Sequence, residues 1–256
     1  MPAGSGASKC SLRTALTGVG AVSKSVRVPA WLWIALLWIG FASTHLILSS
    51  ASLRPRLIGR LGDQPFRGLY SLAVLAWFVA LVWVFAIHKH SGPLLWNTVG
   101  PPAIAEFANA VLMGLAFAVL VAGLIPSQVG PSSMTAPSAA PAEAHGLLRI
   151  TRHPFNAALG LFGVAHLLVN GHVGDVAFFG GFPLFVWIGS RHQDERMSKD
   201  KPGYRELAAR TSLVPFAALV MGRQRLVLAD LPWGGLAAGV VMAVIIRHFH
   251  GTLFGP

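Results

Sequence analysis

The sequence predicts an all-α, polytopic membrane protein, a bundle of about six transmembrane helices that includes one short helical hairpin. Hydrophobic residues make up 54% of the 256 positions and charged residues only 11%. This composition is too apolar for an ordinary soluble domain. Several apolar runs also approach the roughly 20 residues that a helix needs to cross the hydrocarbon core. Tryptophans lie near the ends of these runs, as in the aromatic belts of membrane proteins: Trp31, Trp33, Trp96 and Trp233.

The candidate spans follow one another along the chain. Runs long enough to cross alone are Ala30–Ser50, Gly68–Ile87, Ala103–Ile125 and, less cleanly, Leu228–Ile246. Two shorter apolar segments, Phe155–Asn170 and Val173–Ser190, precede the last run, and we expect Asn170-Gly171-His172 to separate them as a tight turn. We interpret the two segments as a helical hairpin that crosses out and back, with a re-entrant pair as the alternative.

The segments outside these spans differ in kind. Residues 1–28 are rich in glycine, serine and alanine, carry basic but no acidic residues, and predict a disordered arm. Residues 29–226 form the main membrane domain, and residues 227–256 add a C-terminal transmembrane helix and tail. Ser127–Ala144 spaces three prolines among small residues and indicates a flexible loop. Tyr204–Arg210 predicts a short amphipathic helix at the membrane interface.

The chain is strongly basic, with twenty Lys and Arg against nine acids and a net charge of +11. Because the positive charge falls between apolar segments, it indicates contact with anionic lipid headgroups and not with nucleic acid. With six spans, the loops after the first, third and fifth helices carry fourteen of the basic residues, and the opposite side carries six. The positive-inside rule therefore places those three loops in the cytoplasm.

Two histidines lie inside predicted spans and are the main candidates for function. His45 is in Ala30–Ser50 and His166 is in Phe155–Asn170. An ionisable side chain within a membrane helix is costly unless it faces a partner, a cofactor or water. Neutral imidazole is also a common ligand for metals and for haem iron. The pair therefore predicts a site within the membrane, although each histidine could instead hydrogen-bond a neighbouring helix.

A second candidate site occurs where a loop enters the predicted hairpin, at Gly146–Pro154 (GLLRITRHP). Arg149, Arg152 and His153 bring three potential cations together there, and Pro154 suits the first position of a helix. The free N–H groups of a helix start favour an anion. Arg152 and the helix start can therefore hold an anionic group. The alternative is that Arg152 and His153 only anchor the helix at headgroup level.

Other chemistry is not indicated. Cys10 is the single cysteine, so neither an intrachain disulfide nor a cysteine-based metal site can form. The chain has no phosphate-binding P-loop, no His-Glu-x-x-His pair and no Gly-x-Ser-x-Gly elbow. Asp175 borders a span, where such a residue more often satisfies a helix terminus or pairs with a base. The remaining histidines fall at predicted ends or loops, and we expect them to be ordinary polar residues: His88, His90, His145, His172, His192, His248 and His250.

Taken in order, these motifs resemble the NnrU family of integral membrane proteins, which includes plant zeta-carotene isomerases. The resemblance covers most of residues 41–219. The pieces that carry it are Thr44-His45, Arg54, Gly59, Phe66–Ser71 (FRGLYS), Gly146–Pro154, Ala165-His166, Asn170-Gly171 and Arg210-Thr211-Ser212. Arg-His-Pro alone is a weak signal, whereas the ordered set is specific.

The resemblance implies a b-type haem held by His45 and His166. It also implies an apolar or carotenoid-like substrate, or a role in nitrite or nitric oxide metabolism in the bacterial inner membrane; the sequence specifies no oligomeric state. The depths of the two ligands conflict, because His45 should lie roughly 8 Å and His166 roughly 18 Å from the same side at 1.5 Å per residue. His153 matches the depth of His45 better and is the competing second ligand.

A more distant resemblance points to another class of enzyme. Arg152-His153-Pro154, with the later Glu195 and Tyr204, resembles the isoprenylcysteine carboxyl methyltransferase group. This resemblance implies S-adenosylmethionine as the cofactor. Phe155-Asn156 departs from that group's pattern, in which a tyrosine tends to follow the tripeptide. A non-catalytic membrane regulator is the third possibility.

Overall fold

The computed structural model describes residues 28–125, 128, 139, 141 and 143–255. The basic arm expected over residues 1–28 lies outside this part of the chain, apart from Val28. So does most of the loop expected at Ser127–Ala144.

The described chain is an integral membrane protein built from apolar helices. Five helices are long and apolar enough to cross a membrane: α1 (Ala30–Leu48), α3 (Asp63–Ile87), α4 (Pro102–Gly123), α7 (Val173–Asp200) and α10 (Trp233–Phe254). A sixth apolar helix, α6 (Pro154–Leu167), has only 14 residues. The prediction of an all-α membrane bundle is confirmed, and α6 with α7 corresponds to the expected hairpin.

Two helix boundaries differ from those expected. α7 does not end at Ser190 but continues to Asp200, because helix-favouring residues follow and Glu195 pairs with Lys199 four residues later. The last helix begins at Trp233 and not at Leu228. Leu228–Asp230 forms a separate 3₁₀ turn (η2), and Pro232 precedes the helix.

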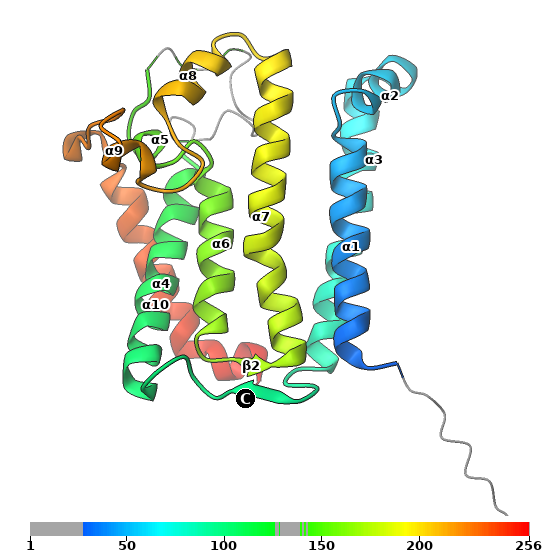
Figure 1. Cartoon of the computed structure of the whole chain (residues 1–256), viewed down its shortest axis with the longest axis vertical. Coiled ribbons are helices and arrows are strands. Elements are labelled where there is room, and N and C mark those ends of the chain that lie inside the picture. Colours follow the sequence, from blue (N-terminus) through cyan, green and yellow to red (C-terminus); the bar gives the residue numbers. More distant parts are fainter. Residues whose placement is uncertain (1–27, 126–127, 129–138, 140, 142, 256) are drawn as a thin grey trace, which may run out of the picture.

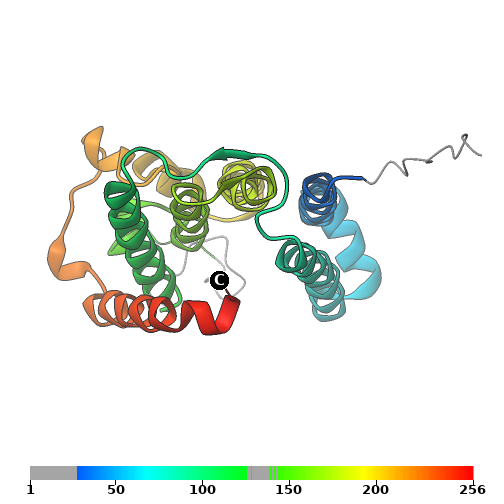
Figure 2. The same ribbon diagram turned by 90° about the horizontal axis from the view of Figure 1, so that it is seen from below.

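The six apolar helices form a curved row. α10 packs on α4, α4 on α6, α6 on α7, α7 on α1, and α1 on α3. The view along the helices shows this order directly (Figure 2). α7 is therefore in the middle of the row and contacts both α6 and α1, the helices that carry the two membrane histidines.

The short elements divide between the two ends of the bundle (Figure 1). The upper end carries α2 (Leu53–Leu61), α5 (Leu147–Ile150), α8 (Tyr204–Arg210) and α9 (Ala217–Val220). These elements lie in the three basic loops, so the structure places those loops at one end, as expected. α8 also has the bounds predicted from the sequence.

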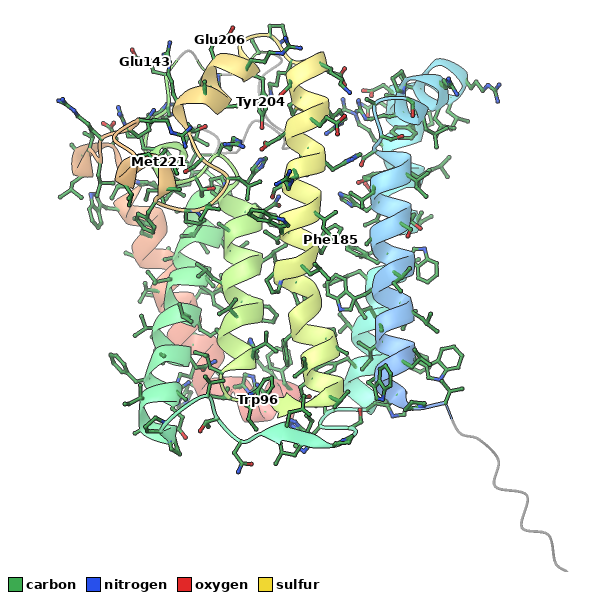
Figure 3. The ribbon with its side chains drawn as sticks, in the orientation of Figure 1. Trp96, Glu143, Phe185, Tyr204, Glu206 and Met221 are labelled. Atoms are coloured by element: carbon green, nitrogen blue, oxygen red, sulfur yellow. The ribbon has the colours of Figure 1, made fainter. Side chains whose placement is uncertain are left out.

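At the lower end the structure corrects the expected turn at Asn170-Gly171-His172. Gly171–His172 forms a short strand, β2, which pairs antiparallel with β1 (Leu94–Trp96) from the α3–α4 connection. Trp96, labelled in Figure 3, donates its indole N–H to the Leu167 carbonyl over 2.9 Å. The α3–α4 connection, which is distant in the sequence, therefore holds the hairpin in place. A turn signal within residues 170–172 cannot reveal such a contact.

The core between α1, α3 and α7 is mainly aromatic. Its buried residues are Ile34, Trp38, Phe41, Leu81, Phe178, Phe179 and Phe182. Trp38 packs over Gly181, where a Cβ would overlap its indole ring, and donates its N–H to the Phe178 carbonyl at 3.1 Å. Aromatic pairs of this kind add about 0.5–1.5 kcal/mol each beyond their buried area.

A proline and a glycine bring α6 close to α7. Pro183 lies inside α7 and has no N–H to donate to the Phe179 carbonyl one turn earlier. Gly163 of α6 lies against this point, because a Cβ there would fall 2.6 Å from that carbonyl oxygen and 2.7 Å from Pro183 Cδ. Only glycine allows this approach, a common device in helix packing within membranes.

The arrangement of the ends predicts a labelling pattern. Single cysteines at Arg60, Glu143 and Arg205, all exposed at the basic end, should react with a membrane-impermeant maleimide from one side in a Cys10→Ser background. Asn97, exposed in the β1 loop, should react only from the other side. The positive-inside rule makes the first side the cytoplasm. Labelling of Asn97 together with Arg205 would show that the order of spans is wrong.

Candidate functional site

His45 lies three residues before the end of α1 and is held by α3 and α7. The Tyr70 hydroxyl is 2.9 Å from His45 Nδ1 and 3.3 Å from its Nε2. The Phe185 ring meets the imidazole edge to face, with centroids 5.2 Å apart. Phe185 lies on the side of α7 that faces α1 (Figure 3). The sequence pointed to His45, but it did not assign a role to Tyr70.

His166 lies near the end of α6, among aromatic rings. Its Nδ1 is 2.9 Å from the Phe162 carbonyl oxygen, and its ring stacks on Phe179 with centroids 4.4 Å apart. A carbonyl oxygen can only accept, so Nδ1 carries the proton and Nε2 of the neutral ring keeps its lone pair. Ligand histidines commonly have this arrangement, in which the second ring nitrogen is fixed by a carbonyl group.

The two histidines approach one aromatic cluster from different levels. Their ring partners on α7, Phe185 and Phe179, are six residues apart, or about 9 Å along the helix. The depth difference expected from the sequence is therefore present. α1 and α6 run in opposite directions, and side chains lean toward the start of their own helix, so the two imidazoles lean toward each other. Among the described residues no ring contact joins His45 to His166.

The space between the histidines is filled by aromatic side chains. Ring contacts lead from His45 to Phe185, Trp38, Phe182, Phe162 and His166. A planar group between the histidines would have to displace part of this cluster. Phe185 and Phe162 are only partly buried, so these two rings have more freedom to move than Phe182 in the core.

Positive charge gathers beside His45 at the basic end. Arg196 of α7 interacts electrostatically with His45, Tyr70 and Arg54, and also with the Asp200 carboxylate of its own helix. Its Nε atom is buried and has no hydrogen-bond partner among the described residues. On the same helix His192 lies with its Nε2 atom 3.2 Å from the Ser49 hydroxyl. A buried guanidinium nitrogen without a partner is costly and favours an anionic group nearby.

The Arg-His-Pro element forms a separate network around Asp194 of α7. Arg152 Nε lies 3.0 and 3.1 Å from the two Asp194 oxygens, and its Nη2 donates to the same carboxylate. His153 Nε2 lies 2.6 Å from Asp194 Oδ1, which also accepts the Tyr204 hydroxyl. Burial, together with the hydrogen bond to Asp194, raises the pKa of Tyr204, so the phenol remains a neutral donor.

Asp194 is therefore an anion that Arg152 holds, as we expected, but no side-chain hydrogen bond caps the start of α6 among the described residues. The side chains of His153, Arg152 and Asp194 are only 2%, 12% and 17% exposed, so the cations are occupied within the chain. His153 remains the alternative second ligand to His45, but it would have to give up Asp194. His153 is the N-cap residue of α6 and Pro154 is the first helical residue, as expected.

The residues expected for a methyltransferase site are only partly brought together. Arg152, His153 and Tyr204 meet at Asp194, whereas Glu195 is 72% exposed and pairs with Lys199 at 3.0 Å. Successive helical residues point about 100° apart, so only one of the two acids can face α6. The sequence could not indicate which one.

The structure also assembles residues that the sequence did not single out. At the lower end His90 and His172 both face Asp175. We expected the two histidines to be ordinary polar residues. The expectation that Asp175 pairs with a base is confirmed. The histidines come from different loops, and no local spacing connects them.

Comparisons with known proteins agree on one family. The NnrU protein model matches residues 33–256. The chain is 31% identical over 215 residues to the chloroplastic 15-cis-zeta-carotene isomerase of Zea mays, an alignment covering 82% of this chain and 56% of that protein. It is 30% identical over 213 residues to the Arabidopsis thaliana protein of the same name, covering 80% and 55%. The chain thus spans about half the length of these curated relatives. No solved structure matches it.

Proposed function

This chain belongs to the NnrU family, and from that premise we propose that it is a haem b-binding membrane protein that isomerises an apolar polyene taken from the lipid. The relatives that are 30–31% identical are named as isomerases of a carotene, which is such a polyene. The proposal includes a bacterial inner membrane as the location, with the basic end in the cytoplasm.

One observation carries the proposal. Two membrane helices each present an imidazole to the same aromatic cluster, and each ring already has a partner at Nδ1. That partner is the Tyr70 hydroxyl for His45 and the Phe162 carbonyl for His166. Fixing Nδ1 orients the ring and leaves Nε2 of His166 available to a ligand. In His45 the Tyr70 hydroxyl also lies 3.3 Å from Nε2, so it would have to stay on Nδ1 alone when Nε2 binds a ligand. The donor set therefore fits a bis-histidine haem, provided that the cluster opens between the rings.

The charge beside His45 fits the same cofactor. Haem b carries two propionate groups, and buried carboxylates require cationic partners. Arg196 has a buried Nε atom that makes no hydrogen bond within the described part of the chain, and Arg54 and Asp200 both interact electrostatically with its guanidinium. These two arginines would hold a propionate at the basic end of the bundle. Arg152 is occupied by Asp194 and would not be needed.

The proposed isomerisation needs few catalytic groups from the remaining residues. A cis–trans isomerisation changes the geometry of a double bond and moves no atoms between molecules. A bound haem would supply a redox-active iron, and His45 and His166 are the residues that would hold it. Tyr70 and the Phe162 carbonyl would hold the rings, while Phe41, Phe162 and Phe185 would keep water away and give an apolar surface to the polyene.

The test is an absorption spectrum of the detergent-purified protein, expressed with ample haem supply. We expect a Soret band, a shift of that band on dithionite reduction, and about one haem b per chain by pyridine haemochrome. Nitric oxide added to the reduced protein tests whether one histidine can leave the iron, which a role in nitrite or nitric oxide metabolism would require. A protein without a Soret band under these conditions would contradict the proposal. Binding of S-adenosylmethionine, with Arg152 as the position to change, would then be measured.

A further inference from the structure

A second cluster of ligand-type side chains lies at the lower end of the bundle, opposite the basic loops. His90 Nδ1 is 2.9 Å and His172 Nδ1 is 3.4 Å from Oδ2 of Asp175. The three ligand atoms lie within 4.8 Å of one another. We propose that His90, His172 and Asp175 bind a divalent first-row transition metal ion, such as Zn²⁺. This site shares no residue with the proposed haem site and does not rest on it.

Backbone hydrogen bonds between two segments that are distant in the sequence hold this cluster in place. Val173 N–H donates to the Pro93 carbonyl at 3.1 Å, and Gly174 N–H donates to the Ser91 carbonyl at 3.0 Å. The pairing of β1 with β2 continues this connection. The start of α7, which carries Asp175, is therefore tied to the loop that carries His90.

His90 itself adopts a conformation that is unusual for its residue type. Its φ is 52°, in the left-handed region that non-glycine residues rarely occupy. The His90 N–H donates to Oδ1 of Asp175 at 3.1 Å and compensates for this conformation. Such strain tends to be kept where a ligand or a reaction needs a particular geometry. Here it directs the imidazole at the second oxygen of the same carboxylate.

The spacing of the ligand atoms fits a metal ion. Nitrogen and oxygen ligands of Zn²⁺ bind at about 2.0–2.2 Å, so two of them at a tetrahedral centre lie about 3.3–3.6 Å apart. The separation of 3.4 Å between His172 and Asp175 matches this value. The separation of 2.9 Å between His90 and Asp175 is that of a hydrogen bond and would lengthen by about 0.4 Å around an ion. Both imidazoles face Oδ2 of Asp175. The other oxygen, Oδ1, accepts the backbone N–H of His90, which fixes the orientation of the carboxylate.

Burial and exposure agree with a site that has one open position. The Asp175 side chain is fully buried, and a buried carboxylate needs a cation or strong donors. The side chains of His90 and His172 are 47% and 30% exposed, so the side of the cluster away from Asp175 is open to water. Three protein ligands plus water is the typical arrangement of a catalytic Zn²⁺ site, and two imidazoles with one carboxylate are a donor set of both Zn²⁺ and Fe²⁺ sites.

The experiment uses the full-length protein in detergent, purified with an affinity tag that contains no histidine. After EDTA treatment and its removal, Zn²⁺ is titrated and bound metal is counted by mass spectrometry. We expect about one tightly bound Zn²⁺ per chain and a higher melting temperature with metal. Co²⁺ in place of Zn²⁺ should give the visible absorption of a nitrogen- and oxygen-ligated site.

Variants separate the site from adventitious binding. His90→Ala and His172→Ala should each weaken Zn²⁺ binding by more than the roughly 10- to 100-fold that loss of an outer-shell partner costs. His88→Ala removes an exposed histidine from the same loop and should bind as the wild type does. For Asp175→Asn, the Zn²⁺ affinity is interpreted together with the size-exclusion elution profile, because loss of a buried charge can affect folding. Equal Zn²⁺ affinity in the wild type and His172→Ala, or no tight site in the wild type, would overturn the proposal.

Discussion

His45→Ala is expected to remove most of the haem b that we propose this protein binds. A b-type haem has no covalent attachment and depends on its axial ligands and pocket. The variant should still insert, because alanine makes α1 more apolar. His166→Ala should either lose haem as well or keep a five-coordinate haem with a shifted Soret band. The measurement is haem per chain, with the spectrum before and after reduction.

Matched variants make this result specific. Tyr70→Phe removes only the hydroxyl beside His45 and should weaken haem binding about 10- to 100-fold without abolishing it. His153→Ala should retain the wild-type spectrum, because the Nε2 atom of His153 is already paired with the Asp194 carboxylate. If His153→Ala loses haem while His166→Ala retains the wild-type spectrum, His153 is the second ligand, as equal depth would require.

Asp194→Ala is expected to cause the largest loss of stability at the basic end. The change leaves Arg152, His153 and the Tyr204 hydroxyl buried without their shared acceptor. Removing one partner of a buried ion pair costs about 3–5 kcal/mol in the free energy of unfolding, because the remaining charge is uncompensated. Thermal unfolding in detergent, followed by size-exclusion chromatography, measures the effect.

The neighbouring acid supplies the control. Glu195→Ala changes the same kind of side chain one residue later, but Glu195 is exposed, and its ion pair with Lys199 lies at the surface. Its removal should leave the unfolding temperature unchanged. Asp194→Asn should fall between the two, since the amide keeps one acceptor and loses the charge. Equal effects of the two alanine variants would mean that Asp194 does not organise this end of the bundle.

Properties encoded locally were predictable from the sequence alone. Apolar runs of sufficient length predicted the membrane helices, and Pro154 after His153 predicted the start of α6. The composition of Tyr204–Arg210 predicted α8 with its observed bounds. The ordered motifs from Thr44 to Ser212 indicated the family that the comparisons then showed. For the helices the signal lies within one segment, where hydropathy, helix propensity and capping act over a few residues. The family signal comes instead from the order of several short motifs.

The partners of the polar side chains were decided only by the tertiary structure. Tyr70 meets His45 across 25 positions, Asp194 meets Arg152 across 42, and Asp175 meets His90 across 85. The choice of Asp194 over Glu195 depends on the rotation of α7 about its own axis. A membrane helix that is apolar on every face carries little information about that rotation. Packing fixes the rotation instead, through contacts such as Gly163 on Pro183 and Trp38 on Gly181.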